Sequence, residues 1–478
     1  MAIDQVDAIS RDGVPDRRYF RTPATAPGPS GPQMLAHLRE IRRDPLGFLQ
    51  GMTRAYGPVM QFPIPSPASY LVSDPVAVRR VLVDRSRSYD KATVQYRSLS
   101  LVTGEGLLTT SGDIWRRQRR MVQPAFHRAS LEAVVGHAAG ATEELLARWG
   151  DTSRGAVIDI DEAMMRVALE TVAASLFGTD LSADADRLAR ATLEALDVVV
   201  SSAQMPIRLP AWAPSQRALR RATRELDEAV HRMVQRRLAE PEPRVDQSDR
   251  VGSAGPPDLL GMLVAALNGD EPIPLREVRD ELVSFMVAGH ETAASAITWA
   301  LWLLAGDALA QQLAIDEVNG VLGDRRIQVD DLPRLPYLRA VIDEAMRLYP
   351  PVWLVTRRAM EPDVLGGREI PAESLVIMTP YLAQRDPDVW PDPDRFDPGR
   401  FLGEQRGGAA GDAAYWPFGL GPRMCIGKDF AYLEATAVLA SLLQRIRVSR
   451  VPGQPERRAV PLVTLRPQDA LPLVVTSR

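Results

Sequence analysis

The stretch that decides the fold is Phe418-Gly419-Leu420-Gly421-Pro422-Arg423-Met424-Cys425-Ile426-Gly427. It holds the one cysteine among 478 residues, in a glycine-rich turn that leads into an apolar segment at 428–446. Glycine lets backbone N–H groups turn toward a sulfur atom, and the amino end of a helix stabilises a thiolate. Arg423 adds a positive charge two residues before Cys425. We therefore expect a functional thiolate here, and not the inert core cysteine that is the default for an isolated residue.

A second motif lies at 336–349, where the apolar spacing predicts a helix that begins at Pro336 and ends before Pro350. Glu344 falls on the apolar stripe of this helix. A buried carboxylate needs a partner, because an unpaired buried charge is very costly. Arg347, three residues further on, can reach it. From these residues alone, an ordinary surface ion pair remains the alternative.

The third motif is Ala288-Gly289-His290-Glu291-Thr292, inside a long apolar helix predicted at 275–306. A mid-helix glycine costs about 1 kcal/mol relative to alanine. The Thr292 hydroxyl can donate to the carbonyl of Ala288 four residues back and loosen the helix locally. An acid and a hydroxyl would thus stand beside a helix distortion. The apolar flanks argue against a simple surface turn.

Together these segments resemble the cytochrome P450 family. The cysteine loop matches the family pattern Phe-x-x-Gly-x-Arg-x-Cys-x-Gly at every defined position, the family has Glu-x-x-Arg before that loop, and its oxygen-binding groove carries an acid–threonine pair. The resemblance extends from about residue 34 to the end of the chain. It implies a mainly α fold with small β-sheets around a buried haem b, with O2 as co-substrate.

The resemblance also implies roles for individual residues. Cys425 would be the axial ligand of the haem iron, and Glu291 and Thr292 would deliver protons. Trp115 and Arg119 (from Trp-x-x-x-Arg) and Arg357 would bind the haem propionates, assisted by Arg423. Phe418, Ala288 and Gly289 are the other residues expected to contact the haem. Arg358 is the neighbour with which Arg357 could be confused. Arg400, in the coil before the loop, would join Glu344 and Arg347 in a structural triad that performs no chemistry.

Three further arginines near this segment, Arg116, Arg117 and Arg120, have two interpretations. They are either a solvated basic helix face or a surface that docks an acidic redox partner. The sequence leaves both open.

Composition agrees with a globular enzyme. There are 57 Lys+Arg against 61 Asp+Glu, and 45% of the residues are hydrophobic, which excludes a disordered chain and argues against a nucleic-acid binder. One cysteine excludes intrachain disulfides and multi-cysteine metal sites.

Periodicity predicts helices at 128–150, 161–177, 183–202, 215–239, 275–306, 336–349 and 428–446, and short strands within 59–73 and 352–379. A proline-rich coil is expected at 387–398.

We expect residues 1–33 to be a flexible N-terminal segment and 34–478 to form a single domain. Residues 241–258 form the most polar stretch, interpreted as a surface loop in preference to a hinge, and 403–412 is a second flexible candidate. No run of 18 apolar residues and no signal-peptide core is present, so no integral membrane segment is expected. With a single cysteine, a reducing, cytoplasmic location follows.

The expected activity is insertion of one oxygen atom of O2 into a C–H bond of a lipophilic small molecule, such as a terpene, polyketide or fatty acyl compound of secondary metabolism. NAD(P)H would supply electrons through a separate ferredoxin and ferredoxin reductase, and the protein would be a monomer. The segments expected to line the substrate are 88–109, 198–212, 284–292, 352–355 and 461–465. Two alternatives stay open: a peroxide-using or rearranging relative, disfavoured by the intact Glu291–Thr292 pair, and a non-catalytic haem-thiolate binder.

Overall fold

The computed structural model describes residues 24–64, 66–178, 195, 213–239, 258–267, 269, 271–403 and 413–478. The chain divides into two compact units. The sheet unit contains the described residues up to Thr93 together with Leu354–Ala383 and Leu420–Pro422, and the helical unit contains Val94–Trp353, Gln384–Gly419 and Arg423–Arg478. Predictions for 1–23, 183–202 (apart from Ala195), 198–212, 241–257 and 404–412 lie outside the described residues. The domain boundaries 1–33 and 34–478 stay predictions.

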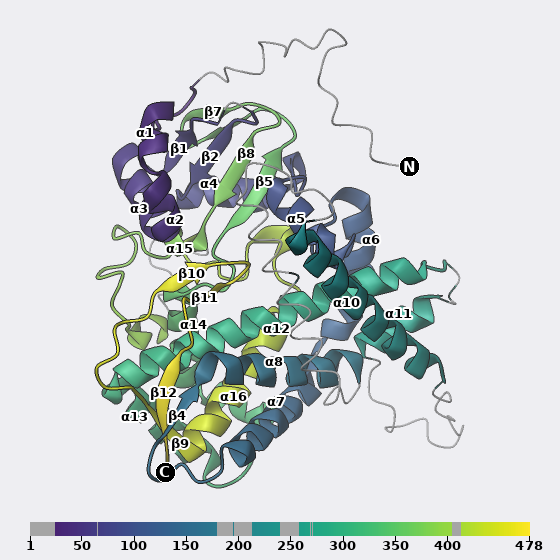
Figure 1. The fold of residues 1–478 in the computed structure, drawn as a ribbon, viewed down its shortest axis with the longest axis vertical. Helices are drawn as coiled ribbons and strands as arrows, with labels where there is room; N and C mark the ends of the chain where they lie inside the picture. Colours follow the sequence, from purple (N-terminus) through teal and green to yellow (C-terminus); the bar gives the residue numbers. More distant parts are fainter. Residues whose placement is uncertain are drawn as a thin grey trace. The chain divides into compact units, whose positions relative to one another are not determined.

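The sheet unit is built on a five-stranded sheet with the order β1-β2-β8-β5-β3. Only β2 and β8 pair in parallel; the other neighbours are antiparallel. The strands are β1 (Val59–Phe62), β2 (Ser69–Val72), β3 (Tyr89–Asp90), β5 (Val355–Ala359) and β8 (Leu375–Met378), with helices α1 (Gly31–Ala36), α2 (Leu38–Arg43), α3 (Pro45–Tyr56), α4 (Pro75–Arg79) and α15 (Pro380–Ala383). Figure 1 shows α1, α2 and α3 beside this sheet.

A separate hairpin in the same unit joins β6 (Asp363–Leu365) to β7 (Arg368–Ile370). Its two-residue turn is Gly366-Gly367, with φ of 53° and 74°. Two consecutive left-handed residues match the twist of a tight hairpin, and glycine adopts them without steric cost. Gly366-Gly367 therefore connects two strands within 352–379, where short strands were predicted.

The helical unit is organised around α12 (Leu275–Gly306), which runs through it beside α8 (Figure 1). Its other helices are α5 (Val94–Thr103), α6 (Gly112–Val122), α7 (Arg128–Trp149), α8 (Ile160–Phe177), α10 (Pro214–Ala239), α11 (Leu259–Leu267), α13 (Ala308–Leu322), α14 (Pro336–Leu348) and α16 (Lys428–Arg445). Every predicted helix within the described residues is confirmed, with ends that differ by at most one residue. The proline-rich coil at 387–398 is confirmed as turns and irregular chain.

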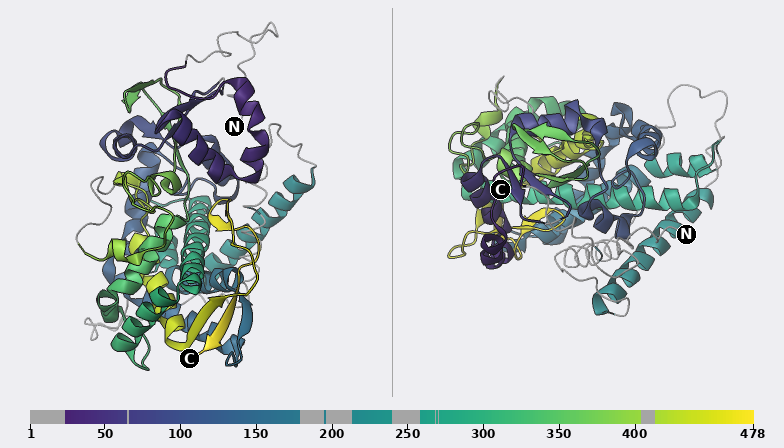
Figure 2. Two further views of the ribbon diagram at one scale, coloured as in Figure 1. Left: turned by 90° about the vertical axis from the view of Figure 1, so that its left-hand side faces the viewer. Right: turned by 90° about the horizontal axis from the view of Figure 1, so that it is seen from above.

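Two small antiparallel sheets complete this unit. One has the order β4-β12-β9, formed by β4 (Ala156–Asp159), β12 (Pro472–Ser477) and β9 (Ile446–Arg450), whose arrows lie side by side in the left view of Figure 2. The other is the hairpin of β10 (Ala459–Pro461) and β11 (Leu465–Pro467). The sequence did not predict these strands. The expected fold class, mainly α with small sheets, is confirmed.

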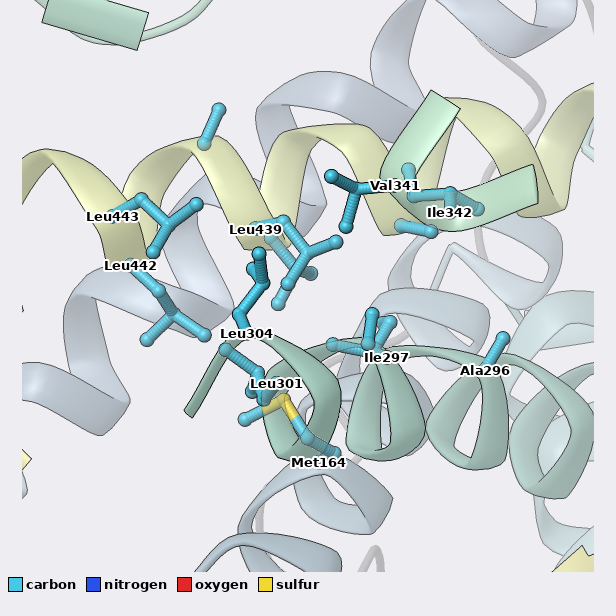
Figure 3. Close-up of a cluster of buried hydrophobic side chains, with 14 of the residues drawn as sticks. Met164, Ala296, Ile297, Leu301, Leu304, Val341, Ile342, Leu439, Leu442 and Leu443 are labelled. Carbon is cyan, nitrogen blue, oxygen red and sulfur yellow. The ribbon is translucent and has the colours of Figure 1, made fainter. Parts of the chain in front are cut away.

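The core around α12 is apolar and closely packed. Leu439, Leu442 and Leu443 of α16 point toward Leu301 and Leu304 of α12 in Figure 3. All five are at most 1% exposed. Burying a leucine side chain contributes about 1.5–3 kcal/mol, so this contact fixes α16, the helix that follows the cysteine loop, against α12.

No single helix within the described residues is long and apolar enough to span a membrane. Helices α12 and α13 meet that test only as a pair bent by 115°.

His290 is a polar side chain within this apolar core. His290 of α12 is fully buried, interacts with the backbone at Met165 of α8, and lies near Arg466. Burial, and next the charge of Arg466, lower the pKa of His290 from 6.5 to about 4. The ring is therefore neutral in the folded protein at neutral pH.

This pKa predicts an acid-sensitive stability. Between pH 6.5 and about 4 the unfolded chain binds a proton at His290 that the folded chain does not, so the free energy of unfolding falls as the pH falls through this window. The full loss is roughly 3 kcal/mol. In urea unfolding at pH 7 and pH 4.5, His290→Gln should lose less stability on acidification than the wild type. The exposed-site control His231→Gln should behave as the wild type; equal losses in all three proteins would contradict the assignment.

Candidate functional site

The cysteine loop is closed by a backbone hydrogen bond within the helical unit. The amide of Cys425 donates to the carbonyl of Phe418 at 2.9 Å, and α16 begins three residues later with Gly427 at its N-cap. The side chain of Cys425 is accessible, although its sulfur lies among many protein atoms. An accessible sulfur at the amino end of a helix agrees with the sequence prediction.

Several nearby groups shift the pKa of the Cys425 thiol in opposite directions. Burial raises the pKa of the Cys425 thiol, whereas the backbone N–H of Gly427 and the charges of Arg119 and Lys428 lower it, and Asp429 raises it. The sequence prediction named Arg423 as the assisting cation. Arg119, which is brought in from α6, and Lys428 also act on the sulfur, and the effect of Arg423 stays a prediction.

Trp115 and Arg119 of α6 stand beside the loop, and the haem contact that the resemblance implies for them stays a prediction. The Arg119 guanidinium donates to the carbonyl of Met424 at 2.9 Å and lies 5.7 Å from the centre of the Trp115 ring. The Arg423 guanidinium lies 5.8 Å from the same ring. Burial lowers the pKa of Arg119, while Cys425 raises it. Two cations and an indole N–H donor are thus gathered next to Cys425.

One glycine of the loop is required by its packing. Gly421 has φ of 67°, and a Cβ atom on it would lie 2.3 Å from the carbonyl oxygen of Leu82 in the sheet unit's π-helical segment Arg80–Asp84. No side chain fits such a backbone approach. Close contact and backbone conformation together explain why the first glycine of the family pattern is required in this chain.

The predicted structural pair is confirmed in α14. Arg347 donates from Nε and Nη2 to the two carboxylate oxygens of Glu344, at 2.6 and 2.8 Å, and both side chains are fully buried. The remaining donors of Arg347 bind the carbonyls of Gln384, Pro393 and Arg395 at 2.9, 2.7 and 3.1 Å. All five guanidinium N–H groups are therefore used.

Arg400 completes this cluster more weakly. Its Nε lies 3.5 Å from Oε1 of Glu344, and Nη2 donates to the carbonyl of Asp392 at 3.0 Å. The amide of Asp397 also donates to Glu344, at 2.9 Å. The coil before the cysteine loop is thus held to α14 through one carboxylate and one guanidinium.

A second polar network beside it was not predicted from the sequence. Asp343 accepts hydrogen bonds from Tyr432 at 2.6 Å and from Tyr415 at 2.9 Å, and from Arg339 at 3.1 Å. The Tyr432 ring packs 5.0 Å from that of Phe418, centre to centre. Phe418, which was expected to contact the haem, is thereby supported from α16.

The acid–threonine segment lies on α12. Thr292 donates its hydroxyl to the carbonyl of Ala288 at 2.5 Å, as predicted. The expected helix distortion is not seen as a break, because α12 is uninterrupted from 275 to 306. Gly289 has a packing reason as well, since a Cβ there would lie 3.1 Å from Val172 of α8.

Glu291 is buried and is held by a partner that the sequence did not indicate. The hydroxyl of Thr464, in the turn between β10 and β11, donates to its Oε1 at 2.8 Å. Both residues are at most 3% exposed. Of the segments predicted to line the substrate, 284–292 and 461–465 are therefore in contact.

The remaining predicted residues belong to the sheet unit or to the surface of α6. Arg357 belongs to the sheet unit, is buried, and donates to the carbonyl of Thr356 at 2.8 Å; its role toward a propionate stays a prediction. Arg116 pairs with Asp113 on α6, and Arg117 pairs with Glu277 at 2.8 Å. These ion pairs agree with a solvated basic face, and the docking of a redox partner there is untested.

The comparisons with known proteins agree with this geometry. The Cytochrome P450 family profile matches residues 26–473. Cyclooctatin synthase of Streptomyces melanosporofaciens is 35% identical over 443 residues, covering 92% of each chain. Pentalenene oxygenase of Streptomyces avermitilis is 32% identical over 460 residues, covering 95% of this chain and 97% of that protein. The crystal structure of CYP175A1 from Thermus thermophilus superposes with a TM-score of 0.74 at 29% identity, covering 94% of this chain and 99% of that one.

A mainly helical fold with a cysteine in this loop at the start of a core helix is the arrangement found in haem-thiolate proteins. The chain belongs to the cytochrome P450 family. It is an oxidoreductase, a P450 monooxygenase that uses haem and O2.

The residues of the helical unit fit a haem. One accessible sulfur, with an amide N–H directed to it, supplies the single soft ligand that haem-thiolate iron needs. Positive charge for the haem carboxylates comes from the guanidinium groups of Arg119 and Arg423. The indole of Trp115, which lies near both of these groups, adds a hydrogen-bond donor.

The Glu344 cluster predicts an order of destabilisation. Arg347→Ala leaves a fully buried carboxylate without its main partner and should lower the free energy of unfolding by about 3–5 kcal/mol. Arg400→Ala removes a longer contact and should cost about 1 kcal/mol or less. Urea unfolding of the purified variants measures both. Equal losses would show that Arg347 is no more central than Arg400.

Proposed function

We propose that the protein hydroxylates or epoxidises a lipophilic secondary metabolite, with electrons from separate donor proteins. The observation that carries this proposal is the joint presence of an accessible cysteine in the family loop and an acid–threonine pair on α12. The thiolate alone would serve a haem-binding sensor. The acid–threonine pair adds the means of proton delivery, which a sensor does not need.

In this proposal Cys425 ligates the haem iron, and Trp115, Arg119 and Arg423 bind its propionates. Haem, when bound, supplies the activation of O2 and the oxygen-insertion chemistry. The amide of Gly427 and the charges of Arg119 and Lys428 favour the thiolate, whereas burial, the largest effect, raises the pKa of the Cys425 thiol; ligation to iron would remove the proton. Arg119 therefore has two roles, as a propionate partner and as a cation for the sulfur.

The distal residues control protons. The Thr292 hydroxyl donates to the Ala288 carbonyl, so its oxygen is left as an acceptor that can order a water molecule. Glu291, the next residue, provides the carboxyl group that exchanges protons with such water. The surrounding helix is apolar, and this limits the water that reaches the site.

The substrate class rests on apolar walls and on relatives. Trp353 donates its indole N–H to the carbonyl of Leu462 at 2.9 Å, which satisfies its polar end and leaves an apolar ring at a predicted substrate segment. Relatives named for cyclooctatin and pentalenene favour a polycyclic terpene over a polyketide. The proposal includes ferredoxin and ferredoxin reductase as the route from NAD(P)H, a monomeric protein, and a cytoplasmic location, where a chain with one cysteine stays reduced.

The test is turnover under labelled oxygen. The purified haem protein is incubated with NADPH, a surrogate ferredoxin and reductase, and a set of cyclic terpene hydrocarbons under ¹⁸O2. The expected product gains one ¹⁸O atom. Equal rates with hydrogen peroxide alone would favour the peroxide-using alternative, and binding of a terpene without any product would favour a non-catalytic binder.

Thr292→Ala provides a sharper prediction. Loss of the hydroxyl removes the acceptor that orders water, so the electrons lost to hydrogen peroxide should rise by about tenfold, less than the roughly 10²–10⁴-fold that a general acid or base typically contributes. The ratio of peroxide to product per NADPH consumed measures this. Thr292→Ser, which keeps the hydroxyl, should stay near the wild type. An unchanged ratio in Thr292→Ala would remove Thr292 from the mechanism.

A further inference from the structure

The turn between β10 and β11 is attached to one stripe of α12. Glu291, Ser295 and Trp299 are spaced four residues apart, so they face the same side of the helix. All three contact two consecutive residues of the hairpin. Thr464 binds Glu291, and the carbonyl of Leu465 accepts from Ser295 Oγ and from Trp299 Nε1, each at 2.8 Å.

Further contacts fix the backbone on either side of Thr464. The amide of Leu465 donates to the carbonyl of Pro351 at 3.0 Å, and Leu462 donates to the carbonyl of Thr464 at 3.0 Å. Arg466 pairs with Asp161 of α8. The Thr464 hydroxyl is therefore held at one position relative to α12, and it is 2.8 Å from the Glu291 carboxylate.

From this arrangement we propose that Thr464 is the positioning residue of Glu291. By donating to Oε1 it favours one rotamer of the Glu291 carboxyl group. This inference rests on the proposed function, in which Glu291 exchanges protons with water beside Thr292. Because Thr464 lies in the predicted substrate segment 461–465, the same turn that borders the substrate also orients the proton-delivering acid.

The placement also has an energetic reason. Both side chains are buried, and a buried carboxylate is stabilised by a hydrogen bond to its charged form. A valine at 464 has the shape of threonine but donates nothing. A serine at 464 donates but lacks the methyl group. The two variants therefore separate the donor from the packing.

The first experiment measures coupling in the haem protein with NADPH, surrogate donors and a terpene substrate. Thr464→Val should raise peroxide formed per NADPH three- to tenfold, and Thr464→Ser should remain within twofold of the wild type. Thr142→Val is the matched control, because it deletes another fully buried threonine hydroxyl, bonded to Ala138 on α7, and it should leave coupling unchanged. The proposal is overturned if Thr464→Val forms no more peroxide per NADPH than the wild type. It is also overturned if Thr464→Ser forms as much peroxide per NADPH as Thr464→Val.

The second experiment does not depend on activity. Urea unfolding of the wild type, Thr464→Val, Glu291→Gln and the double variant forms a thermodynamic cycle. The effects of the two substitutions on the free energy of unfolding should be non-additive, because Thr464→Val already removes the hydrogen bond that Glu291→Gln weakens. Additive unfolding free energies overturn the contact itself.

The two experiments also separate this inference from the proposed function. If the wild type forms no oxygenated product with any donor, the proposed function fails, and the positioning role fails with it whatever the unfolding cycle gives. If the wild type is active and the cycle is non-additive but Thr464→Val is fully coupled, the proposed function stands and Thr464 is structural only.

Discussion

The buried pair of Arg347 and Glu344 is the interaction on which the rest of the site depends. Each of the five N–H groups of Arg347 has an acceptor, two of them on Glu344 and three on carbonyls of the coil at 384–395. A charge pair buried this deeply is stable only when it is fully hydrogen-bonded. Its stability is therefore inseparable from the path of the coil, which continues to Phe418 and the cysteine loop. Asp343 holds the same region through Tyr415 and Tyr432.

Helix α12 supplies the second constraint, because one helix serves packing and chemistry at once. Its leucines bury the core against α16, and Gly289 allows the close approach of α8. Glu291, Ser295 and Trp299 face the β10–β11 turn from the same stripe. The acid is thus placed by a rigid element and oriented by a hairpin that is itself fixed at three consecutive residues. Proton delivery needs this precision, since a misplaced carboxyl group cannot pass its proton to an ordered water.

Local patterns could be predicted from the sequence, and distant partners could not. The Glu344–Arg347 and Thr292–Ala288 bonds join residues three and four apart, where helix geometry alone brings them together. Arg400 and Trp115 came from the family resemblance, since nothing local relates them to the loop. Thr464 lies 173 residues from Glu291 in the sequence, and a threonine in a turn carries no signal of its partner. The effect of Arg119 on the sulfur could not be predicted either, because Arg119 belongs to α6 and lies far from the loop in the sequence.

The central claim is that Cys425 is a thiolate ligand of haem iron, and the ferrous–carbon monoxide difference spectrum tests it most directly. Thiolate ligation predicts a Soret band at about 450 nm, the position that defines haem-thiolate proteins. The band should disappear in Cys425→Ser and persist in Lys428→Gln, which changes only a neighbouring charge. A wild-type band at about 420 nm, or retention of the thiolate band in Cys425→Ser, would contradict the assignment of the ligand.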